Sequence, residues 1–474
     1  MTFASMEFAA LLLVTLLLYW SLPGRFRIPL LLAASYLFYA YWNPWYAGLI
    51  LLSTVVDYTA GRFIHQSPHQ RARQLAMWTS VAVNLGLLGY FKYTNFGLAV
   101  LHELLGSAAS PLPRALDILL PVGISFYTFQ TMAYTIDIYR RQLVPERNFL
   151  TFALFVAYFP QLVAGPIERA RDLLPQLRQH AVWQDARAEE GLRLLLWGFA
   201  KKLVVADRLA AIAAPLFSEP TGHGGPDLIF AALAMVTMLY FDFSAYTDMA
   251  RGSSALFGIR LSENFRLPLA ATNIAEFWRR WHITLSTWVR DYLYLPLGGF
   301  RPRDRAHHIR TTLLTMGLVG LWHGANWTYV IWGLQHGVIM ILYQLFHMRY
   351  HRRLKNQAWA QGRAFAFAGW ALTMAMHGVN MVWFFSPSLT QALAYFGRVL
   401  QPAAWTQDWY PATLPCSLVL AALWAVHASG ERVDVLDRVA RAAAPWRAAF
   451  YLLLLFAVVG LGVTHSASFV YFQF

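Results

Sequence analysis

Cysteine is almost absent from this chain, since Cys416 is the only one among 474 residues. A single cysteine excludes an intramolecular disulfide framework, a cysteine-rich zinc site and an iron–sulfur cluster. Cys416 lies in an apolar run, where we expect its thiol to be inert. No feature of the sequence therefore predicts a metal site.

Charged residues are also scarce, at 13% of the chain, whereas soluble domains carry about 25%. Hydrophobic residues make up 58% and the mean hydropathy is +0.41. These values exclude an ordinary soluble globule and predict an all-α polytopic membrane protein. The net charge of +14 comes from Lys and Arg in short loops between apolar runs. That distribution follows the positive-inside rule, so we attribute the charge to topology and expect no nucleic-acid partner.

The longest stretch without Asp, Glu, Lys or Arg is 311–348. It exceeds the ~20 residues that cross a bilayer, and Gly324 with Asn326 offers a natural break near its middle. The sequence therefore predicts a membrane hairpin with His323 at the bend. Ionisable groups inside a membrane are costly and usually functional, which makes His323 a candidate catalytic or relay residue. The alternative is a neutral histidine bonded to a backbone carbonyl where helices cross.

Loop charges orient the remaining apolar runs. They place the N-terminus and the tail at 466–474 outside and the basic loops in the cytoplasm. The run at 149–165 has basic flanks on both sides and is expected to be re-entrant. The first run is interpreted as a retained span and not as a signal peptide. The spans are expected at 5–22, 28–42, 45–61, 75–91, 118–138, 192–214, 228–247, 364–385, 412–427 and 447–464.

Residues 273–294 predict an amphipathic helix at the inner interface. Asn273 is placed to cap it, with Glu276 as a capping-box partner. Aromatic residues, Trp278 among them, recur at helical spacing and form a stripe, with His282 facing inward or at its border. Arg279, Arg280 and Arg290 lie off this stripe. An ordinary interfacial helix shows the same composition. The alternative is that its arginines contact the phosphates of an acyl donor such as coenzyme A. The residues expected to bind the donor are then Arg279, Arg280, Trp278 and Asn326.

Asp242 and Asp248 lie near an expected membrane boundary. Two carboxylates could serve acid–base chemistry or a cation, but their separation of six residues does not put them on one helical face. We therefore favour ion pairs with Arg251 or with interfacial arginines.

Several motifs together resemble the membrane-bound O-acyltransferase (MBOAT) family. Within it, the match is to the bacterial branch that O-acetylates cell-surface polymers, typified by the membrane subunit of alginate O-acetylation. The pair Trp-Arg-Arg-Trp-His and Leu-Trp-His-Gly is the most specific part. The motifs occur at 124–130, 159–169, 241–252, 264–299, 320–337 and 469–474.

The resemblance implies a single funnelled domain over 1–474, with about 11–13 membrane helices and a catalytic core near 120–347. His323 matches the invariant family histidine and His282 the second one. Acetyl-CoA would be the donor substrate, with no bound cofactor, and Asn326 would help to shape the donor path. The implied setting is the bacterial inner membrane, with membrane lipids around the chain. An extracytoplasmic transferase would be the partner for alginate, a similar exopolysaccharide or peptidoglycan.

Two alternatives to this function remain open from the sequence. A D-alanyl transferase of teichoic acid synthesis would share both histidine motifs but take its acyl group from a carrier protein. A lipid or solute transporter would also use buried polar groups and broken helices, although the sequence has no detectable repeat of its two halves.

Tyr471 supplies the only side-chain hydroxyl within residues 469–474. These residues are mostly aromatic, so we expect them to be buried in a groove of this chain or of a partner. The phenol of Tyr471 is a possible relay for the acyl group. The favoured alternative is that Tyr471 is an interfacial anchor or part of a docking segment.

Overall fold

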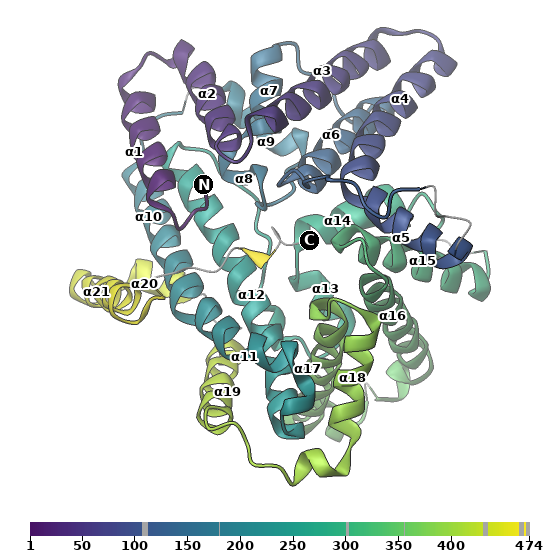
Figure 1. Cartoon of the computed structure of the whole chain (residues 1–474). Helices are drawn as coiled ribbons and strands as arrows, with labels where there is room; N and C mark the ends of the chain where they lie inside the picture. The colour runs from purple at the N-terminus through teal and green to yellow at the C-terminus, as the bar shows by residue number, and fades with distance from the viewer. Residues whose placement is uncertain are drawn as a thin grey trace. The chain divides into compact units, whose positions relative to one another are not determined.

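The computed structural model describes residues 1–106, 112–179, 181–299, 303–354, 356–429, 435–463 and 469–470. This part of the chain is built from helices and connecting segments (Figure 1). None of the described residues is assigned to a β-strand. The predicted all-α fold is therefore confirmed. Among the described residues, five helices are long and apolar enough to cross a membrane, which makes this a multi-pass membrane protein. They are α3 (Pro44–Gln66), α12 (Gly225–Leu256), residues Trp327–Tyr350 of α16 (Trp327–Leu354), α17 (Arg363–Phe385) and α21 (Ala444–Leu461).

The helices gather into two compact units. The first comprises Met1–Leu195 and Tyr246–Ser262, and the second comprises Leu196–Ala245 and Glu263–Val470 among the described residues. The single domain expected from the sequence stays a prediction.

The first unit contains α3 and most of the other helices of the N-terminal half. They are α1 (Met6–Ser21), α2 (Arg27–Ala40), α4 (Gln70–Leu88), α5 (Thr94–Leu105), α6 (Ile124–Tyr139), α7 (Phe149–Ala157), α8 (Phe159–Leu162), α9 (Ala170–Arg178) and most of α10 (Asp185–Phe199).

Helices α3, α4 and α6 pack around a buried carboxylate, Asp57. Its oxygens accept hydrogen bonds from Ser80 Oγ at 2.5 Å and from Asn84 Nδ2 at 2.9 and 3.0 Å. Ser53 Oγ lies 3.3 Å from the same carboxylate, and Ser80 Oγ lies 3.1 Å from Thr135 Oγ1 on α6. These bonds compensate the burial of the polar groups and tie the three helices together.

Two expected elements of this unit have different bounds in the structure. The run at 118–138 was expected to be helical throughout, but α6 begins only at Ile124. Pro121 and Gly123 precede it, and Gly123 has a φ of 79°, which a residue with a side chain rarely adopts. The run at 149–165 forms α7 and α8, of nine and four residues, interrupted at Tyr158. Neither is long enough to cross a bilayer, in agreement with a re-entrant element.

The second unit contains a π-helix over Ala200–Ala206 and the remaining helices. They are α11 (Asp207–Ser218), residues 225–245 of α12 (Gly225–Leu256), α13 (Ile274–Arg280), α14 (Ile283–Val289), α15 (Arg305–His323), α16 (Trp327–Leu354), α17 (Arg363–Phe385), α18 (Leu389–Leu400), α19 (Thr413–Ser429), α20 (Val435–Arg441) and α21 (Ala444–Leu461).

The predicted helical hairpin is present: α15 and α16 lie side by side and are joined by a bend at Gly324 (Figure 1). Of the two helices, α16 is among those long and apolar enough to cross a membrane. The chain leaves the helical conformation at Gly324, whose φ is −161° and ψ is 148°. Glycines let the two helices approach closely, because a Cβ at Gly320 would clash with the carbonyl oxygen of Tyr329 and one at Gly333 with that of Met316.

The single helix expected over 273–294 is wrong, since the chain breaks between α13 and α14. Trp281 is extended and His282 has a left-handed backbone, with a φ of 42°. The predicted cap is present, because Asn273 Oδ1 accepts from the Glu276 N–H at 2.9 Å. Glu276 does not complete the expected capping box with Asn273, and its carboxylate accepts instead from Thr272.

Candidate functional site

His323 is the last residue of α15 and its side chain is buried, with 4% exposed. The rings of Trp322 and Trp332 have centroids 4.9 Å from that of His323, and the ring of Phe384 lies 5.5 Å away. Three helices supply these neighbours: α15, α16 and α17. The imidazole therefore sits at the bend of the hairpin in an aromatic surrounding.

His282 is fully buried at the break between α13 and α14. Its Nδ1 lies 3.1 Å from Asn264 Oδ1. The same oxygen accepts from Thr284 N–H at 3.2 Å and from Thr284 Oγ1 at 3.0 Å, which identifies it as the amide oxygen. An amide oxygen only accepts, so the ring carries its proton on Nδ1 and the lone pair lies on Nε2. Burial lowers the pKa of His282 to about 3 and keeps the ring neutral.

Asn264 also explains why the helix breaks at this point. Its backbone carbonyl accepts from Ile283 N–H at 3.0 Å, and its side chain accepts from Thr284 N–H. Both are first-turn donors of α14, which have no partners within their own helix. A residue eighteen positions earlier in the chain thus caps α14 and holds His282.

Trp322 is the shared neighbour of the two histidines. Its ring centroid lies 6.4 Å from that of His282 and 4.9 Å from that of His323. All three residues belong to the second unit. The structure therefore brings together the two histidines that the sequence singled out.

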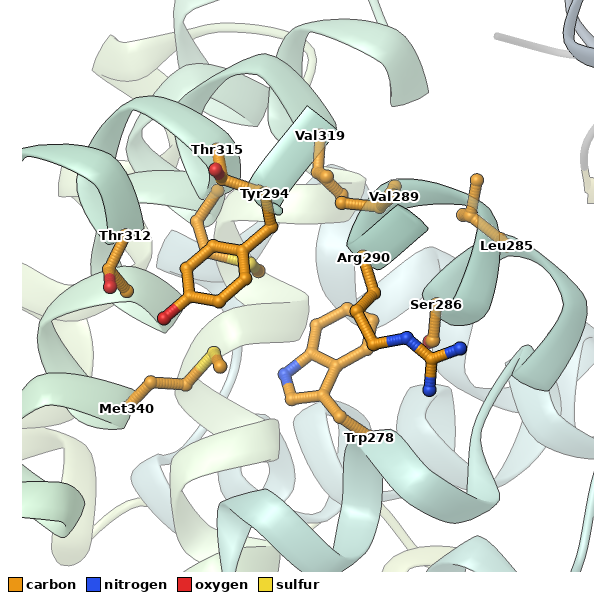
Figure 2. A pocket seen from close by; sticks show the side chains of 11 residues that line it. Trp278, Leu285, Ser286, Val289, Arg290, Tyr294, Thr312, Thr315, Val319 and Met340 are labelled. Atoms are coloured by element: carbon orange, nitrogen blue, oxygen red, sulfur yellow. The ribbon is translucent and has the colours of Figure 1, made fainter. Parts of the chain in front are cut away.

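A cavity of about 230 Å³ lies between α13, α14, α15 and α16 (Figure 2). Figure 2 shows the Trp278 indole and the Tyr294 ring facing this space, with the Arg290 guanidinium beside Trp278. Arg290 is exposed and pairs with Asp291 at 2.8 Å. The other lining residues are mostly apolar: Leu285, Ser286, Val289, Thr312, Thr315, Met316, Val319 and Met340.

The four residues predicted to contact the donor differ in their surroundings. Trp278 lines the cavity, and Arg279 is exposed on α13. Arg280 pairs with Glu276 at 2.5 Å, which ties it to its own helix. Asn326 accepts from the Thr328 N–H at 3.0 Å and donates to the carbonyl of Pro387 at 2.9 Å. Both Arg280 and Asn326 thus make bonds that stabilise the local fold.

The two aspartates of α12 form ion pairs, as favoured from the sequence. Asp248 lies 3.6 Å from Arg251. Asp242 pairs with Lys202 at 2.7 Å and not with an arginine. The expected partner of Asp242 was therefore wrong, because Lys202 comes from a distant segment.

Sequence reasoning missed Lys202 and Asn264, and it named Arg290 only as one of the helix arginines. Lys202 follows Lys201 inside the apolar run at 192–214, and a buried charge in such a run is itself a signal. Arg290 was placed off the aromatic stripe because a continuous helix was assumed. No local pattern marks Asn264, whose importance depends on a long-range contact.

A second buried histidine pair was also missed. His336 on α16 and His377 on α17 have ring centroids 5.6 Å apart. Asn380 Nδ2 lies 3.0 Å from His336 Nε2, and the Phe277 ring lies 3.8 Å from that of His377. These contacts hold α13 against α16 and α17. Histidines within apolar helices are the signal that could have found them.

Tyr471, the possible acyl relay, lies outside the described residues. Phe469 and Val470 are described, and both are buried. In the described ranges, no group of three or more His, Cys, Asp or Glu side chains is arranged to hold a metal ion.

Comparison with known proteins adds two kinds of evidence. Residues 33–388 match the model of the membrane-bound O-acyltransferase family. The chain is 42% identical over 388 residues to a probable alginate O-acetylase of Azotobacter vinelandii, covering 81% of this chain and 77% of that protein. It is 35% identical over 391 residues to a peptidoglycan O-acetyltransferase of Helicobacter pylori, covering 77% and 72%. A teichoic acid D-alanyltransferase of Bacillus subtilis is 28% identical over 234 residues, covering 48% and 59%.

Proposed function

Since this chain belongs to the membrane-bound O-acyltransferase family, we propose that it takes an acetyl group from cytoplasmic acetyl-CoA and passes it across the membrane. The acetyl group then O-acetylates an extracytoplasmic polysaccharide with the help of a partner transferase. Relatives named as acting on alginate and on peptidoglycan support this class of acceptor. The setting is the bacterial inner membrane, with both ends of the chain outside.

The observation that carries the proposal is the meeting of His282 and His323 around Trp322. Both histidines are buried, and both lie within the residues that match the family. The cavity lined by Trp278 and Met316 is built from the same helices. Neither histidine is among the residues that line this cavity, but they lie on or beside the helices that form it. Buried imidazoles and an apolar cavity on the same helices suit acyl transfer from a thioester.

In the proposed reaction, His323 is the general base. The acceptor hydroxyl oxygen bonds to the acetyl carbon while its proton passes to the imidazole, and the C–S bond breaks. The proton then leaves with the thiol of coenzyme A. A thioester is activated enough to need no bound cofactor, and general-base help typically contributes ~10²- to 10⁴-fold in rate. His282, neutral and oriented by Asn264, positions the donor or stabilises charge at its carbonyl.

The donor is proposed to enter the apolar cavity, with its phosphates near arginines. Arg290 at the cavity and the exposed Arg279 are suited to this contact, because a guanidinium binds phosphate oxygens bidentately. Arg279→Ala should raise KM for acetyl-CoA more than it lowers kcat, since phosphate contacts are made equally in ground and transition states. Arg280→Ala is the comparison, because Arg280 is paired with Glu276. A pure loss of kcat in Arg279→Ala contradicts the donor contact.

Tyr471 is proposed as a relay that carries the acetyl group as a phenyl ester. Tyr471→Phe keeps the aromatic ring and removes the nucleophilic oxygen. If the relay operates, this variant acetylates its polymer no better than a chain lacking residues 469–474. Mass spectrometry should then find an acetyl group on the wild-type peptide that contains Tyr471, and this group should require His323. If Tyr471→Phe acetylates its polymer normally, the relay hypothesis is wrong and residues 469–474 have only a docking role.

The D-alanyl transferase is the second candidate, because a relative named for that activity matches 48% of this chain. Its identity of 28% is below the 42% to the probable alginate O-acetylase, which favours O-acetylation. Family membership likewise favours an enzyme over the transporter.

Purified protein in detergent tests the proposal. Hydrolysis of acetyl-CoA that is lost in His323→Ala supports the acetyl donor. Activity only with an acylated carrier protein supports the D-alanyl transferase. No turnover of either thioester contradicts both candidates.

A further inference from the structure

Phe469 and Val470 lie in the interior of the second unit, with 4% and 7% of their surfaces exposed. The Val470 N–H donates to Asp242 Oδ2 at 3.0 Å. Asp242 is itself 1% exposed, so this is a buried hydrogen bond between a backbone amide and a carboxylate. Such charge-assisted bonds are stronger than neutral ones.

The other oxygen of Asp242 is engaged by Lys202 at 2.7 Å. The same ammonium lies 2.8 Å from Asp207 Oδ1, and the side chains of Lys202 and Asp207 are 8% and 3% exposed. Ions are expensive to bury, and losing one partner leaves the others uncompensated. Packing alone therefore does not explain why three charged side chains are buried together here.

The chain leading to Val470 is attached to the segment that supplies Lys202. The Leu461 carbonyl accepts from Arg208 Nε at 2.7 Å, and the Val463 N–H donates to the Leu203 carbonyl at 3.2 Å. Lys202 and Leu203 belong to the π-helix over Ala200–Ala206. Single π-helical turns are rare and occur frequently at functional sites.

The buried end of this segment reaches the surroundings of His282 through one ring. The Phe469 and Phe243 rings have centroids 5.6 Å apart. Phe243, which is fully buried, lies edge-on to His282 with centroids 4.8 Å apart. The position of Phe469 therefore bears on the packing around the imidazole.

We propose that Asp242, paired with Lys202, forms a clamp that holds the segment 469–470 as part of the wall behind His282. Asp242 is then a positioning residue for acyl transfer, acting through the Val470 amide, Phe469 and Phe243. This role in the reaction rests on the proposed function, whereas the clamp itself can be tested without it.

The two oxygens of Asp242 make the clamp testable. One oxygen binds Lys202 and the other accepts from Val470. An asparagine has only one acceptor oxygen, so Asp242→Asn cannot serve both partners. Asp207→Asn is a matched control, because it removes the same charge from Lys202 but leaves the Asp242–Val470 bond in place.

The single cysteine of the chain allows a direct measurement. In a Cys416→Ser background, Val470→Cys keeps the backbone N–H and places a thiol at a buried position. Adding Asp242→Asn should raise the rate of maleimide labelling by about 10-fold or more, the range expected for losing a bond to a charged group. Adding Asp207→Asn should change the rate by less than about threefold. Equal increases in the two variants, or no increase in Asp242→Asn, overturn the clamp.

Turnover separates a positioning role from a purely structural one. Asp242→Asn should lower kcat by about 10-fold while KM for acetyl-CoA changes by less than about twofold, because the segment does not line the donor cavity. Asp207→Asn should lower kcat less. A parallel rise of KM overturns the positioning role. If wild-type protein turns over no acetyl-CoA, the proposed function fails while the labelling experiment still decides the clamp.

A further variant covers the case in which Asp242→Asn does not fold. Val470→Pro removes the N–H donor and leaves the three buried charges in place. Faster deuterium uptake in the peptide that contains Phe469 supports the clamp, and unchanged uptake overturns it.

Discussion

A buried carboxylate in the first compact unit and a buried imidazole in the second have different surroundings. In the first unit, Asp57 receives hydrogen bonds from hydroxyl and amide groups, including Ser80 at 2.5 Å and Asn84 at 2.9 Å. In the second unit, His323 lies among the rings of Trp322, Trp332 and Phe384. Both groups are almost fully buried, with 0% and 4% exposed.

Under the proposed function, this difference separates a polar group that builds the fold from one that takes part in the reaction. The hydrogen bonds of the Asp57 network join α3, α4 and α6 and stabilise the packing of these helices. His323 lies among aromatic rings from three helices, and in the proposed reaction it takes the proton of the acceptor hydroxyl. Both side chains are buried, so burial alone does not separate these two roles.

The largest expected effect is on activity in the second unit. His323→Ala should lower polymer acetylation by ~10²- to 10⁴-fold, because it removes the proposed general base. Folding should be retained, since alanine is tolerated at the end of α15 and the neighbours are apolar rings. Acetyl ester on the polymer and size-exclusion behaviour in detergent measure the two effects.

A matched control for this variant is His427→Ala. His427 is a buried histidine of the same unit, on α19, and its ring packs on Tyr240 at 5.0 Å. We expect it to retain most activity per folded molecule. Wild-type acetylation by His323→Ala, or an equal loss in both variants, contradicts the assignment of His323.

The second prediction concerns the first unit, where we expect a loss of stability without a loss of activity. Asp57→Ala should lower the free energy of unfolding by about 2–4 kcal/mol, because Ser80 and Asn84 lose a buried acceptor. Its kcat per folded molecule should stay close to that of the wild type. Thermal unfolding in detergent and turnover of the surviving protein measure the two quantities. A loss of kcat at unchanged stability would show that the Asp57 network belongs to the chemistry.

The third prediction concerns Asn264, which stabilises the fold by capping α14 and also accepts a hydrogen bond from His282. Asn264→Ala removes the acceptor for His282 Nδ1 and for Thr284. We expect kcat to fall by about 10-fold, because the imidazole loses its fixed tautomer and orientation. Asn264→Asp is the comparison, since a carboxylate keeps the acceptor. If Asn264→Asp is as impaired as Asn264→Ala, orientation of His282 through this bond is not what matters.

The sequence predicted those parts of the fold that depend on local pattern. The hairpin α15–α16 follows from its uncharged length and from Gly324, and the cap of α13 follows from Asn273. The ion pair of Asp248 with Arg251 is also local, three residues along one helix. His323 could be selected because a histidine inside such a run is unusual.

Long-range contacts decided the parts that the sequence missed. Periodicity over 273–294 is compatible with one helix, but Asn264 caps α14 from outside and the backbone turns at His282. Lys202 meets Asp242 although forty residues separate them. Neither pairing leaves a periodic signal, because each depends on how distant helices pack.

The smallest expected effect is a change in the pH dependence of stability, at a carboxyl with fewer partners than Asp57. Burial raises the pKa of Glu168 to about 7, although hydrogen bonds from Ser262 N–H and Oγ act in the opposite direction. The folded state therefore binds more protons than the unfolded state between about pH 4.5 and pH 7, so stability falls as the pH rises through this window. Glu168→Gln cannot ionise, and the drop in melting temperature between pH 5 and pH 8 should shrink by about 2–4 °C. Glu103→Gln, at an exposed position, is the control and should leave the drop unchanged. Parallel pH profiles for wild type and Glu168→Gln would show that Glu168 is ionised throughout this pH range. Hydrogen bonding would then outweigh burial at Glu168, and its surroundings would resemble those of Asp57.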